Sequence, residues 1–433
     1  MSWVGLISIV VLLLLILLQI PVGAAMAITG FAGLVYMSGL TPAFGVLATS
    51  TYSSLSSYAM SVIPLFVLMG FFAFYAGISH DLYRAAHIWL SRIRGGLAMG
   101  TVVGCAGFAV CSGSSVATGA TMATVAFPEM RRYGYDDHLI TGSLAAGGTI
   151  GILIPPSICF IVYALITEQS VGRLFLAGIL PGIFEVSTYL ATIYIMCKIK
   201  PEFAPPIPPT QMAAIDKLRA LGNVWGVLLL FILVMGGIYG GIFTPTEAGA
   251  AGAFGAFLLM VAKGKLTRSN LAGALEEAGQ TTAMVFFIFI GATIFGYLLA
   301  ISQLPMQMAV WISSLPLSRY AILAGFLLIF VLLGCIMDTL AIILLVVPII
   351  FPAVLELGFD PIWFGVLMVR ISEIGLITPP VGLNVYVIKG VAKDVPLSVM
   401  FKGIIPFLLS DIVGVIVLLV FPQIALFLPG LMK

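Results

Sequence analysis

The sequence predicts an all-α polytopic membrane protein, built from an inverted-topology repeat with two re-entrant helical hairpins and about ten full spans. Three observations predict this fold class. Hydrophobic residues make up 61% of the 433 positions and charged residues only 8%, whereas soluble domains carry about 25% charged residues. The apolar runs continue for about 18 residues or more, which is typical of membrane-spanning helices and unlike the alternating strands of a β-barrel. One stretch of the first half also recurs in the second half.

The composition excludes several classes of protein. A soluble chain needs far more charged residues to cover its surface, and a disordered chain needs low hydrophobicity. The net charge of +2, without a stripe of basic and aromatic residues, gives no support for a nucleic-acid partner. The five cysteines form no CxxC pair, and the three histidines lack zinc-ligand spacing. The motifs of proteases, hydrolases and P-loop ATPases are absent, so we expect neither an enzyme nor ATP hydrolysis by the chain itself.

The N-terminal region, residues 1–57, is predicted to form scaffold helices. Residues 4–18 are strongly apolar and Gly23 begins a possible cleavage site, but no Lys or Arg precedes the apolar run, as a secretory signal requires. Apolar sequence also resumes directly afterwards. We therefore interpret residues 2–19 and 21–40 as two spans joined by a tight turn.

Ten apolar segments in all are interpreted as full spans, and two further apolar stretches are unusual. Residues 95–130 are interrupted by seven glycines, and residues 320–352 hold a lone acid, Asp338. Each of these stretches could be one span or a re-entrant helical hairpin. The ten predicted spans are residues 2–19, 21–40, 58–79, 139–165, 174–197, 222–240, 245–262, 281–303, 362–388 and 403–428.

The distribution of Lys and Arg favours the hairpin interpretation, because cytoplasmic loops of membrane proteins are rich in these residues. With both stretches re-entrant and the N-terminus outside, the inside loops hold 15 of the 19 Lys and Arg residues and the outside loops hold three. Arg370 is left within the membrane. Making either stretch a full span breaks this partition. We therefore predict that both termini face outside, that the first hairpin enters from the cytoplasm, and that the second enters from the outside.

The internal repeat aligns residues 111–156 with residues 335–380 without a gap, and ten of the 46 positions are identical. Apolar bias could explain matching Ala and Ile residues, but it explains the paired Gly, Asp and Pro-Pro residues less well. Two units follow, at residues 58–197 and 281–428, and the predicted topology starts them on opposite sides of the membrane. This inverted arrangement is typical of secondary transporters. Residues 198–280, between the units, are predicted to hold a proline-rich linker at 201–209 and further scaffold helices.

Each repeat unit contains a Gly-x-x-x-Pro-Pro break inside a predicted span, beginning at Gly151 in the first unit and at Gly375 in the second. Two successive prolines remove two backbone donors, so the helix must unwind. Unwound backbone at membrane depth is tolerated only where it is buried in protein or lines a polar cavity. Its carbonyls can coordinate Na⁺, and half-helix N-termini can face an anion. A simple proline kink is the alternative, but two equivalent breaks favour an ion or substrate site.

The predicted hairpin tips carry the matching polar groups. Residues 111–115 read Cys-Ser-Gly-Ser-Ser and align with Cys-Ile-Met-Asp-Thr at 335–339, so Ser114 matches Asp338. An acid in the bilayer is costly and suggests function, and carboxylate, hydroxyl and carbonyl oxygens suit an alkali cation. The alternatives are close helix packing by the serines and an acid held by structural hydrogen bonds.

Other embedded polar residues give weaker signals. Arg370 and Glu373 are three positions apart on one predicted helix and could pair with each other. Arg370 could instead meet a carboxylate substrate. Asn384 follows the second break and could donate to substrate or to backbone, while Glu185 and Asp411 are expected near span ends.

Four motifs resemble the large membrane subunit of TRAP transporters, the tripartite ATP-independent periplasmic transporters. They are GILIPPS from Gly151, LFLAGILPG from Leu174, GIFTPTEA from Gly241 and ITPPVGLNV from Ile377. Because these motifs are spread through the sequence, the resemblance covers essentially the whole chain. It implies an elevator-type transporter of the ion transporter superfamily, in which the repeat cores and both hairpins move against a scaffold.

The resemblance also implies Na⁺-driven uptake of an organic acid, such as sialic acid or a C4-dicarboxylate, delivered by a soluble periplasmic binding protein. A small four-helix membrane subunit, a separate polypeptide, would lie beside the scaffold. The chain would then function among lipids in the bacterial inner membrane, with both termini periplasmic, with Na⁺ as the coupling ion and without another cofactor.

Carried over by motif, the resemblance implies two Na⁺ sites and a substrate site between the tips. The first Na⁺ site would use Ser112 and Ser114 with carbonyls near Gly151, Ile154 and Pro156. The second would use Asp338 and Thr339 with Gly375, Thr378 and Pro380. The substrate would lie near Ser115, Thr339 and Asn384, with Arg370 as a further candidate.

Three other functions stay open at this point. A passive channel would ignore the Na⁺ gradient. A structural subunit of a larger complex would tolerate changes at the hairpin tips. A stand-alone Na⁺/dicarboxylate or proton carrier would work without a binding protein.

Overall fold

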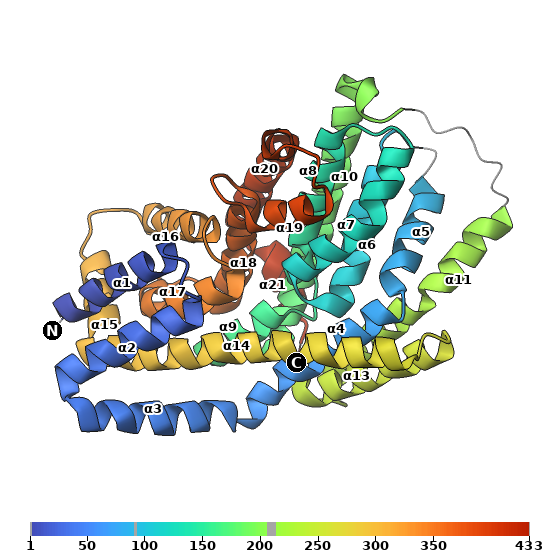
Figure 1. The fold of residues 1–433 in the computed structure, drawn as a ribbon. Coiled ribbons are helices and arrows are strands. Elements are labelled where there is room, and N and C mark those ends of the chain that lie inside the picture. The colour runs from blue at the N-terminus through green and yellow to red at the C-terminus, as the bar shows by residue number, and fades with distance from the viewer. Residues whose placement is uncertain (1, 91–92, 206–213, 433) are drawn as a thin grey trace.

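The computed structural model describes residues 2–90, 93–205 and 214–432, and the regular elements of these residues are all helices (Figure 1). Six helices are long and apolar enough to cross a membrane, and the bent pair Asp137–Leu153 and Ile158–Thr167 would make a seventh. The protein is therefore an all-α, multi-pass membrane protein, as its composition predicts. The ten spans stay a prediction.

The N-terminal region, residues 2–57, contains three helices, where the hydropathy pattern predicted two spans. They are α1 (Ser2–Leu17), α2 (Val22–Ser38) and α3 (Leu40–Leu55). Gly39 has φ +89° and separates α2 from α3. A left-handed backbone of this kind favours glycine and stops a helix, so the apolar sequence continues through a turn that hydropathy alone does not reveal.

Both predicted repeat units contain the same order of elements: a helix, a short helix, a hairpin pair, a broken pair and a long helix. The first unit consists of α4 (Val62–Tyr75), α5 (Ile78–Leu90), α6 (Gly96–Ser112), α7 (Ser115–Arg132), α8 (Asp137–Leu153), α9 (Ile158–Thr167) and α10 (Val171–Ile199). The second consists of α14 (Arg268–Ser302), α15 (Leu304–Ser313), α16 (Arg319–Gly334), α17 (Thr339–Glu356), α18 (Pro361–Ile377), α19 (Leu383–Val391) and α20 (Leu397–Val420). Each glycine-rich or acid-bearing stretch is thus a pair of helices and not one continuous helix.

The segment between the units contains α11 (Ala214–Phe231), a π-helical turn at Ile232–Gly236, α12 (Gly237–Tyr239) and α13 (Pro245–Ala262), and α21 (Gln423–Gly430) follows the second unit. The predicted linker at 201–209 lies partly outside the described residues, which include only 201–205 of it. Thr244 and Glu247 form a capping box at the start of α13, where Pro245 occupies the first turn.

Several identities in the sequence repeat have the same local structural cause. Asp136 and Asp360 are the N-cap residues of α8 and α18, and the side chain of each accepts a 2.8 Å hydrogen bond from the backbone N–H two residues later. Such caps satisfy amides that the first helical turn leaves unpaired. Gly134 and Gly358, which precede the caps, have φ +74° and +73°. The matched residues therefore mark the same turn and helix start in both units.

The helix α14 is longer than the span predicted at 281–303 and contains 35 residues. It begins earlier because the Thr267 hydroxyl caps it, accepting a 3.1 Å hydrogen bond from the Asn270 amide. In Figure 1 it runs across the lower part of the molecule, beside α2. Gly291 lies so close to α2 that a Cβ built on it would be 2.1 Å from the Gly23 carbonyl oxygen. Small residues permit this approach of two membrane helices.

An exposed ion-pair cluster links the two repeat units at the end of α7. The Arg131 guanidinium lies 2.9 Å from the Asp137 carboxylate and 2.5 Å from that of Asp394, in the loop before α20. Hydrogen bonding to Arg131 holds the pKa of Asp394 below its ordinary value. Exposed pairs of this kind contribute little to the free energy of unfolding.

Candidate functional site

The tip of the first hairpin is pressed against the first helix break. A Cβ built on Gly113, at the tip, would lie 2.9 Å from the Pro156 carbonyl oxygen. A Cβ built on Gly151 would lie 2.7 Å from both the Ser114 carbonyl oxygen and the Thr118 hydroxyl oxygen. Tip and break therefore meet backbone to backbone, because glycine stands on both sides of the contact.

Two side-chain hydroxyls and one backbone carbonyl gather at this contact. The hydroxyl oxygens of Ser112 and Thr118 are 2.6 Å apart, and the Ser112 hydroxyl lies 3.5 Å from the Ser114 carbonyl oxygen. Thr118 is fully buried. The sequence did not nominate Thr118 as a ligand, although it lies one helical turn after Ser114 on α7, a spacing that places two residues on one helix face. Ile154, in contrast, directly follows α8 and packs its side chain against Gly182 of α10.

The second hairpin meets the second break in the same manner. A Cβ built on Gly375 would lie 2.6 Å from the Gly334 Cα, and the Cys335 thiol lies 3.6 Å from the Pro379 carbonyl oxygen. Asp338, half-buried, is the N-cap residue of α17, and its carboxylate lies near the backbone N–H groups of Leu340 and Ala341.

The last two residues of the predicted second Na⁺ site lie within the break itself. The Thr378 hydroxyl donates a 2.6 Å hydrogen bond to the Ile374 carbonyl oxygen, and Pro380 is exposed. The Pro-Pro bonds of both breaks are cis.

Glu373 lies between the two tips and contacts both of them. Its Oε1 accepts hydrogen bonds from the Thr339 hydroxyl at 2.7 Å and from the Ser115 hydroxyl at 3.5 Å. Thr339 belongs to the second hairpin and Ser115 to the first, so one carboxylate joins the two halves of the predicted site. Sequence spacing had suggested Arg370 as the partner of Glu373, and this pairing is wrong in the structure. The Oε2 atom of Glu373 has no hydrogen-bond partner among the described residues.

Asn384 also lies beside the first tip. A Cβ built on Gly148 would lie 3.4 Å from the Asn384 Nδ2 atom and 3.4 Å from the Ser115 carbonyl oxygen. Asn384 is buried, and within the described part of the chain neither atom of its amide has a partner. Ser115 thus lies near Thr339, through Glu373, and near Asn384, through Gly148, and the substrate site that the sequence predicted at these three residues stays a prediction.

Arg370 lies away from the tips, in a buried ion cluster of its own. Its guanidinium contacts the carboxylates of Glu185, on α10, and Asp411, on α20, the latter at 2.7 Å. Both acids lie in the middle of their helices and are fully buried, so the expected position near span ends is wrong. The Thr149 hydroxyl donates to Glu185 at 3.2 Å. The cluster therefore ties α8 and α10 of the first unit to α18 and α20 of the second.

A cavity of about 700 Å³ opens between the tips and the helices α4 and α14. Ser112–Ala117 and Ile336–Leu340 form one wall, and α4 and α14 form the other, where Glu277 accepts a 2.8 Å hydrogen bond from the Tyr75 hydroxyl. Two acids, Asp338 and Glu277, line this cavity, and its described lining contains no Lys or Arg. The cavity is thus acidic.

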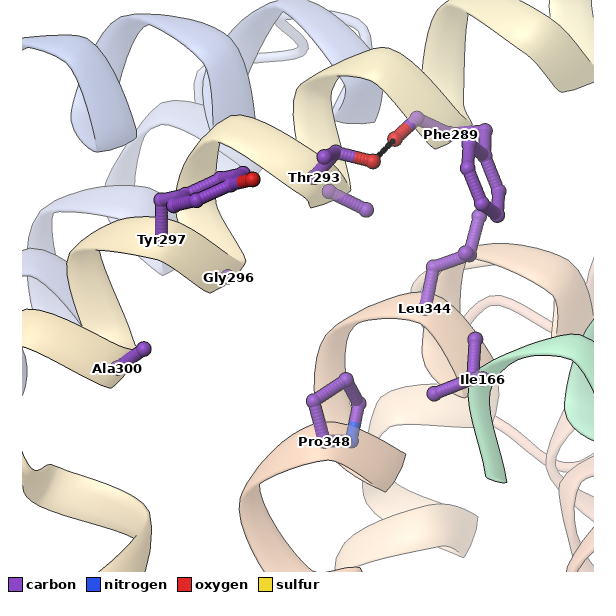
Figure 2. Close-up of a pocket in the computed structure, with 9 residues that line it drawn as sticks. Ile166, Phe289, Thr293, Gly296, Tyr297, Ala300, Leu344 and Pro348 are labelled. Carbon is purple, nitrogen blue, oxygen red and sulfur yellow. Dashed lines mark hydrogen bonds between the residues drawn. The ribbon is translucent and has the colours of Figure 1, made fainter. Parts of the chain in front are cut away.

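A second cavity, of about 320 Å³, lies between α14 and the helices α9 and α17 (Figure 2). Apart from Thr293 and Tyr297 its labelled residues are apolar, and the Thr293 hydroxyl donates to the Phe289 carbonyl oxygen at 2.9 Å. Pro348 and Leu344 face it from α17. Its described lining is mainly apolar and contains no acid, whereas two acids line the cavity at the tips, which is therefore the candidate site.

Replacing Gly151 with Ala should damage the first tip contact. The added methyl group would meet a backbone carbonyl oxygen and the buried Thr118 hydroxyl, and such overpacking costs about 1–3 kcal/mol. We expect a lower melting temperature of the purified protein and weaker ion dependence of any activity. Gly325→Ala is the matched control, since a Cβ at Gly325 has no neighbour within 4 Å. Equal behaviour of the two variants would show that the tip contact is not tight.

Comparisons with known proteins agree with the motifs. A family model described as "Tripartite ATP-independent periplasmic transporter, DctM component" matches residues 9–424. The C4-dicarboxylate TRAP transporter large permease protein DctM of Pseudomonas aeruginosa is 37% identical over 385 residues, which cover 89% of each chain. The sialic acid TRAP transporter large permease protein SiaM of Vibrio cholerae is 30% identical over 414 residues, which cover 95% of each chain.

Among solved structures, that of the Alcanivorax borkumensis YdaH transporter has a similar fold. The TM-score is 0.60 at 16% sequence identity, and the match covers 92% of this chain and 89% of that one. At this identity the likeness concerns the fold alone. The family model and the relatives confirm the family that the four motifs indicated. The chain belongs to the tripartite ATP-independent periplasmic (TRAP) transporter family, as a large permease (DctM) component.

Proposed function

We propose that this subunit couples Na⁺ to the import of an organic-acid anion, such as a C4-dicarboxylate or sialic acid, by an elevator mechanism. One observation carries the proposal: each hairpin presses on the helix break of its own half, at Gly151 and at Gly375, and both tips line one cavity that contains two acids. Hydroxyl, carboxylate and freed carbonyl oxygens are then concentrated at two equivalent places, as a pair of Na⁺ sites requires.

The first proposed Na⁺ site uses hydroxyl and carbonyl oxygens only. Ser112 and Ser114 provide the tip, with carbonyls of Gly151, Ile154 and Pro156 from the break, and Thr118 joins them because of its 2.6 Å contact with Ser112. The second proposed site adds a negative charge. Its members are Asp338 and Thr339 with backbone of Gly375, Thr378 and Pro380.

The acidic cavity indicates how an anion can bind here. An organic acid entering beside Asp338 and Glu277 meets like charge and no basic side chain in the described lining, and such repulsion costs binding energy. Bound Na⁺ reverses this charge and makes the site attractive. Ser115, Thr339 and Asn384 then supply polar contacts to the substrate. Arg370 is omitted from the substrate site, because Glu185 and Asp411 already neutralise it.

Removing Na⁺ should therefore prevent anion binding and not only its accumulation. We expect the purified membrane complex to be stabilised against heat by the anion only when Na⁺ is present, while Na⁺ alone also stabilises it. Choline chloride at equal concentration serves as the ionic-strength control. Stabilisation by the anion in choline alone would contradict the proposed order of binding.

The elevator mechanism rests on the repeat. The two units share one order of elements, and the Lys and Arg distribution places them in opposite orientations, with ten spans and two re-entrant hairpins. An inverted pair can alternate between two equivalent states. In this mechanism α2, α4, α13 and α14 form the stationary scaffold, and the hairpins with α8, α9, α18 and α19 move against it.

The proposed partners follow from the family and its relatives. A tripartite transporter requires a small membrane subunit and a periplasmic binding protein beside the large permease. The isethionate TRAP transporter permease protein DctMQ of Oleidesulfovibrio alaskensis matches 96% of this chain, while this chain covers 65% of that protein. We therefore place the subunit in the bacterial inner membrane, with both termini periplasmic, beside a small four-helix subunit.

Transport by the reconstituted complex tests the function. Proteoliposomes containing this chain and its small subunit should accumulate a C4-dicarboxylate or sialic acid only with an inward Na⁺ gradient and a cognate binding protein. Uptake without the binding protein would favour a stand-alone carrier. Rapid flux that ignores Na⁺ would favour a channel, and either result would overturn the proposal.

A further inference from the structure

Glu373 is a buried carboxylate at the centre of the site with half of its hydrogen-bonding capacity unused. Only 1% of its surface is exposed. One oxygen accepts from the hydroxyls of Thr339 and Ser115, which line the cavity, and the other oxygen has no partner among the described residues. Glu373 therefore lies directly behind the cavity wall, between the two tips.

The charge of Glu373 is not balanced by the protein. Arg370 is the only buried Lys or Arg in the described residues, and it contacts Glu185 and Asp411. An unpaired carboxylate away from water is very costly. The two proposed Na⁺ sites do not remove this cost, because the first contains no acid and the second is built on Asp338. Neutralising Glu373 therefore takes one more positive charge between the tips, either a cation or a proton.

Asn384 supplies an independent sign of a missing ligand. It is 1% exposed, and neither its Oδ1 nor its Nδ2 has a partner among the described residues. A Cβ built on Gly148 would lie 3.4 Å from the Asn384 Nδ2 atom and 3.4 Å from the Ser115 carbonyl oxygen, so the amide lies near the first tip. Buried amide groups without partners are rare, so two such side chains around one residue, Ser115, indicate that something binds between them.

The atoms available for binding are hard oxygens. Glu373 Oε2 and Asn384 Oδ1 are free acceptors, and a hydroxyl that donates its proton keeps lone pairs for an ion, which applies to Ser115 and Thr339. Oxygen ligands of this kind select alkali and alkaline-earth cations. A single carboxylate among neutral oxygens matches a monovalent ion, since one charge then balances one charge.

We infer that Glu373, Asn384, Ser115 and Thr339 form a third Na⁺ site between the hairpin tips. The inference rests on the proposed Na⁺ coupling and adds one ion to it. The third ion neutralises Glu373 and supplies positive charge at the cavity wall where the organic acid binds. Each transport cycle should therefore move one Na⁺ more than the two tip sites provide.

The test measures how many Na⁺ ions move with each substrate molecule. In proteoliposomes containing the complete complex, the substrate gradient is fixed, the membrane voltage is held at zero and the Na⁺ gradient is varied. The Na⁺ gradient at which no net substrate flux occurs gives this ratio. Glu373→Gln keeps the side-chain shape and should lower the ratio by one. Glu373→Asp should keep it, as should Glu356→Gln, a control at an exposed position near the end of α17. An unchanged ratio in Glu373→Gln, as a bound proton would give, overturns the inference.

A direct count of bound ions covers the case in which Glu373→Gln transports too slowly. The purified Glu373→Gln complex should retain one ²²Na⁺ fewer per molecule than the unmodified complex. Equal retention by the two complexes overturns the inference. Failure of the proposed function looks different. In that case the unmodified complex shows no Na⁺ coupling at all, whereas failure of the third site alone leaves coupling intact and identical in both proteins.

Discussion

Replacing Asp338 with Asn should raise the Na⁺ concentration for half-maximal uptake by at least about tenfold, which corresponds to about 1.4 kcal/mol of lost binding free energy. Asp338 is the acid that lines the cavity from the second tip, and a carboxylate binds an alkali cation more strongly than a neutral amide does. Asn is as good an N-cap residue as Asp, so the start of α17 should survive and the loss should be confined to the ion.

The measurement is initial uptake as a function of Na⁺ at saturating binding protein and substrate. Asp360→Asn provides a matched control, because Asp360 is the N-cap residue of α18 and accepts hydrogen bonds from the amides of Ile362 and Trp363. It should change stability slightly and leave the Na⁺ dependence unaltered. Equal Na⁺ curves for the unmodified protein and Asp338→Asn would remove Asp338 from the proposed site.

Sequence patterns predicted the local features of the fold because those features have local causes. The Pro-Pro breaks appear where two donors are missing, and both end a helix, α8 at Leu153 and α18 at Ile377. The paired Asp residues proved to be caps at equivalent helix starts. The extra N-terminal helix and the longer α14 were missed, since a single glycine turn and a threonine cap leave the hydropathy pattern unchanged.

Partners of buried charges were beyond the sequence because they are set by tertiary packing. Spacing along one helix suggested that Arg370 pairs with Glu373, three residues away. In the structure Arg370 forms ion pairs with Glu185 and Asp411, which lie on two other helices. Glu373 instead accepts a hydrogen bond from the Thr339 hydroxyl. The sequence did contain one usable signal: acids are so rare here that each apolar helix carrying one was a candidate partner.

These pairings change the interpretation of the site. With Arg370 occupied, the described ionisable side chains around the two tips are acids, Asp338 and Glu373, with Glu277 opposite. Under the proposed Na⁺ coupling, an anion carrier with such a site depends on its coupling ions for electrostatic attraction. Coupling then follows directly from binding, because the substrate cannot be held in a site that its ions have left.

Replacing Arg370 with Met should prevent stable folding and not merely weaken substrate binding. The change leaves the carboxylates of Glu185 and Asp411 buried without a cation, and breaking a buried ion pair in this way costs about 3–5 kcal/mol. Because the cluster joins α8 and α10 to α18 and α20, its loss should separate the two units. We expect a strongly reduced yield of the purified complex and a clearly lower melting temperature.

A second variant separates a structural Arg370 from a substrate-binding one. Combining Arg370→Met with Glu185→Gln and Asp411→Asn removes all three charges, and neutral replacements of buried ion clusters are often tolerated. This triple variant should recover much of the lost stability and should transport with a substrate KM close to that of the unmodified complex. A stable Arg370→Met protein with a large rise in KM would instead assign Arg370 to the substrate, and the cluster would then be a resting arrangement that the anion displaces.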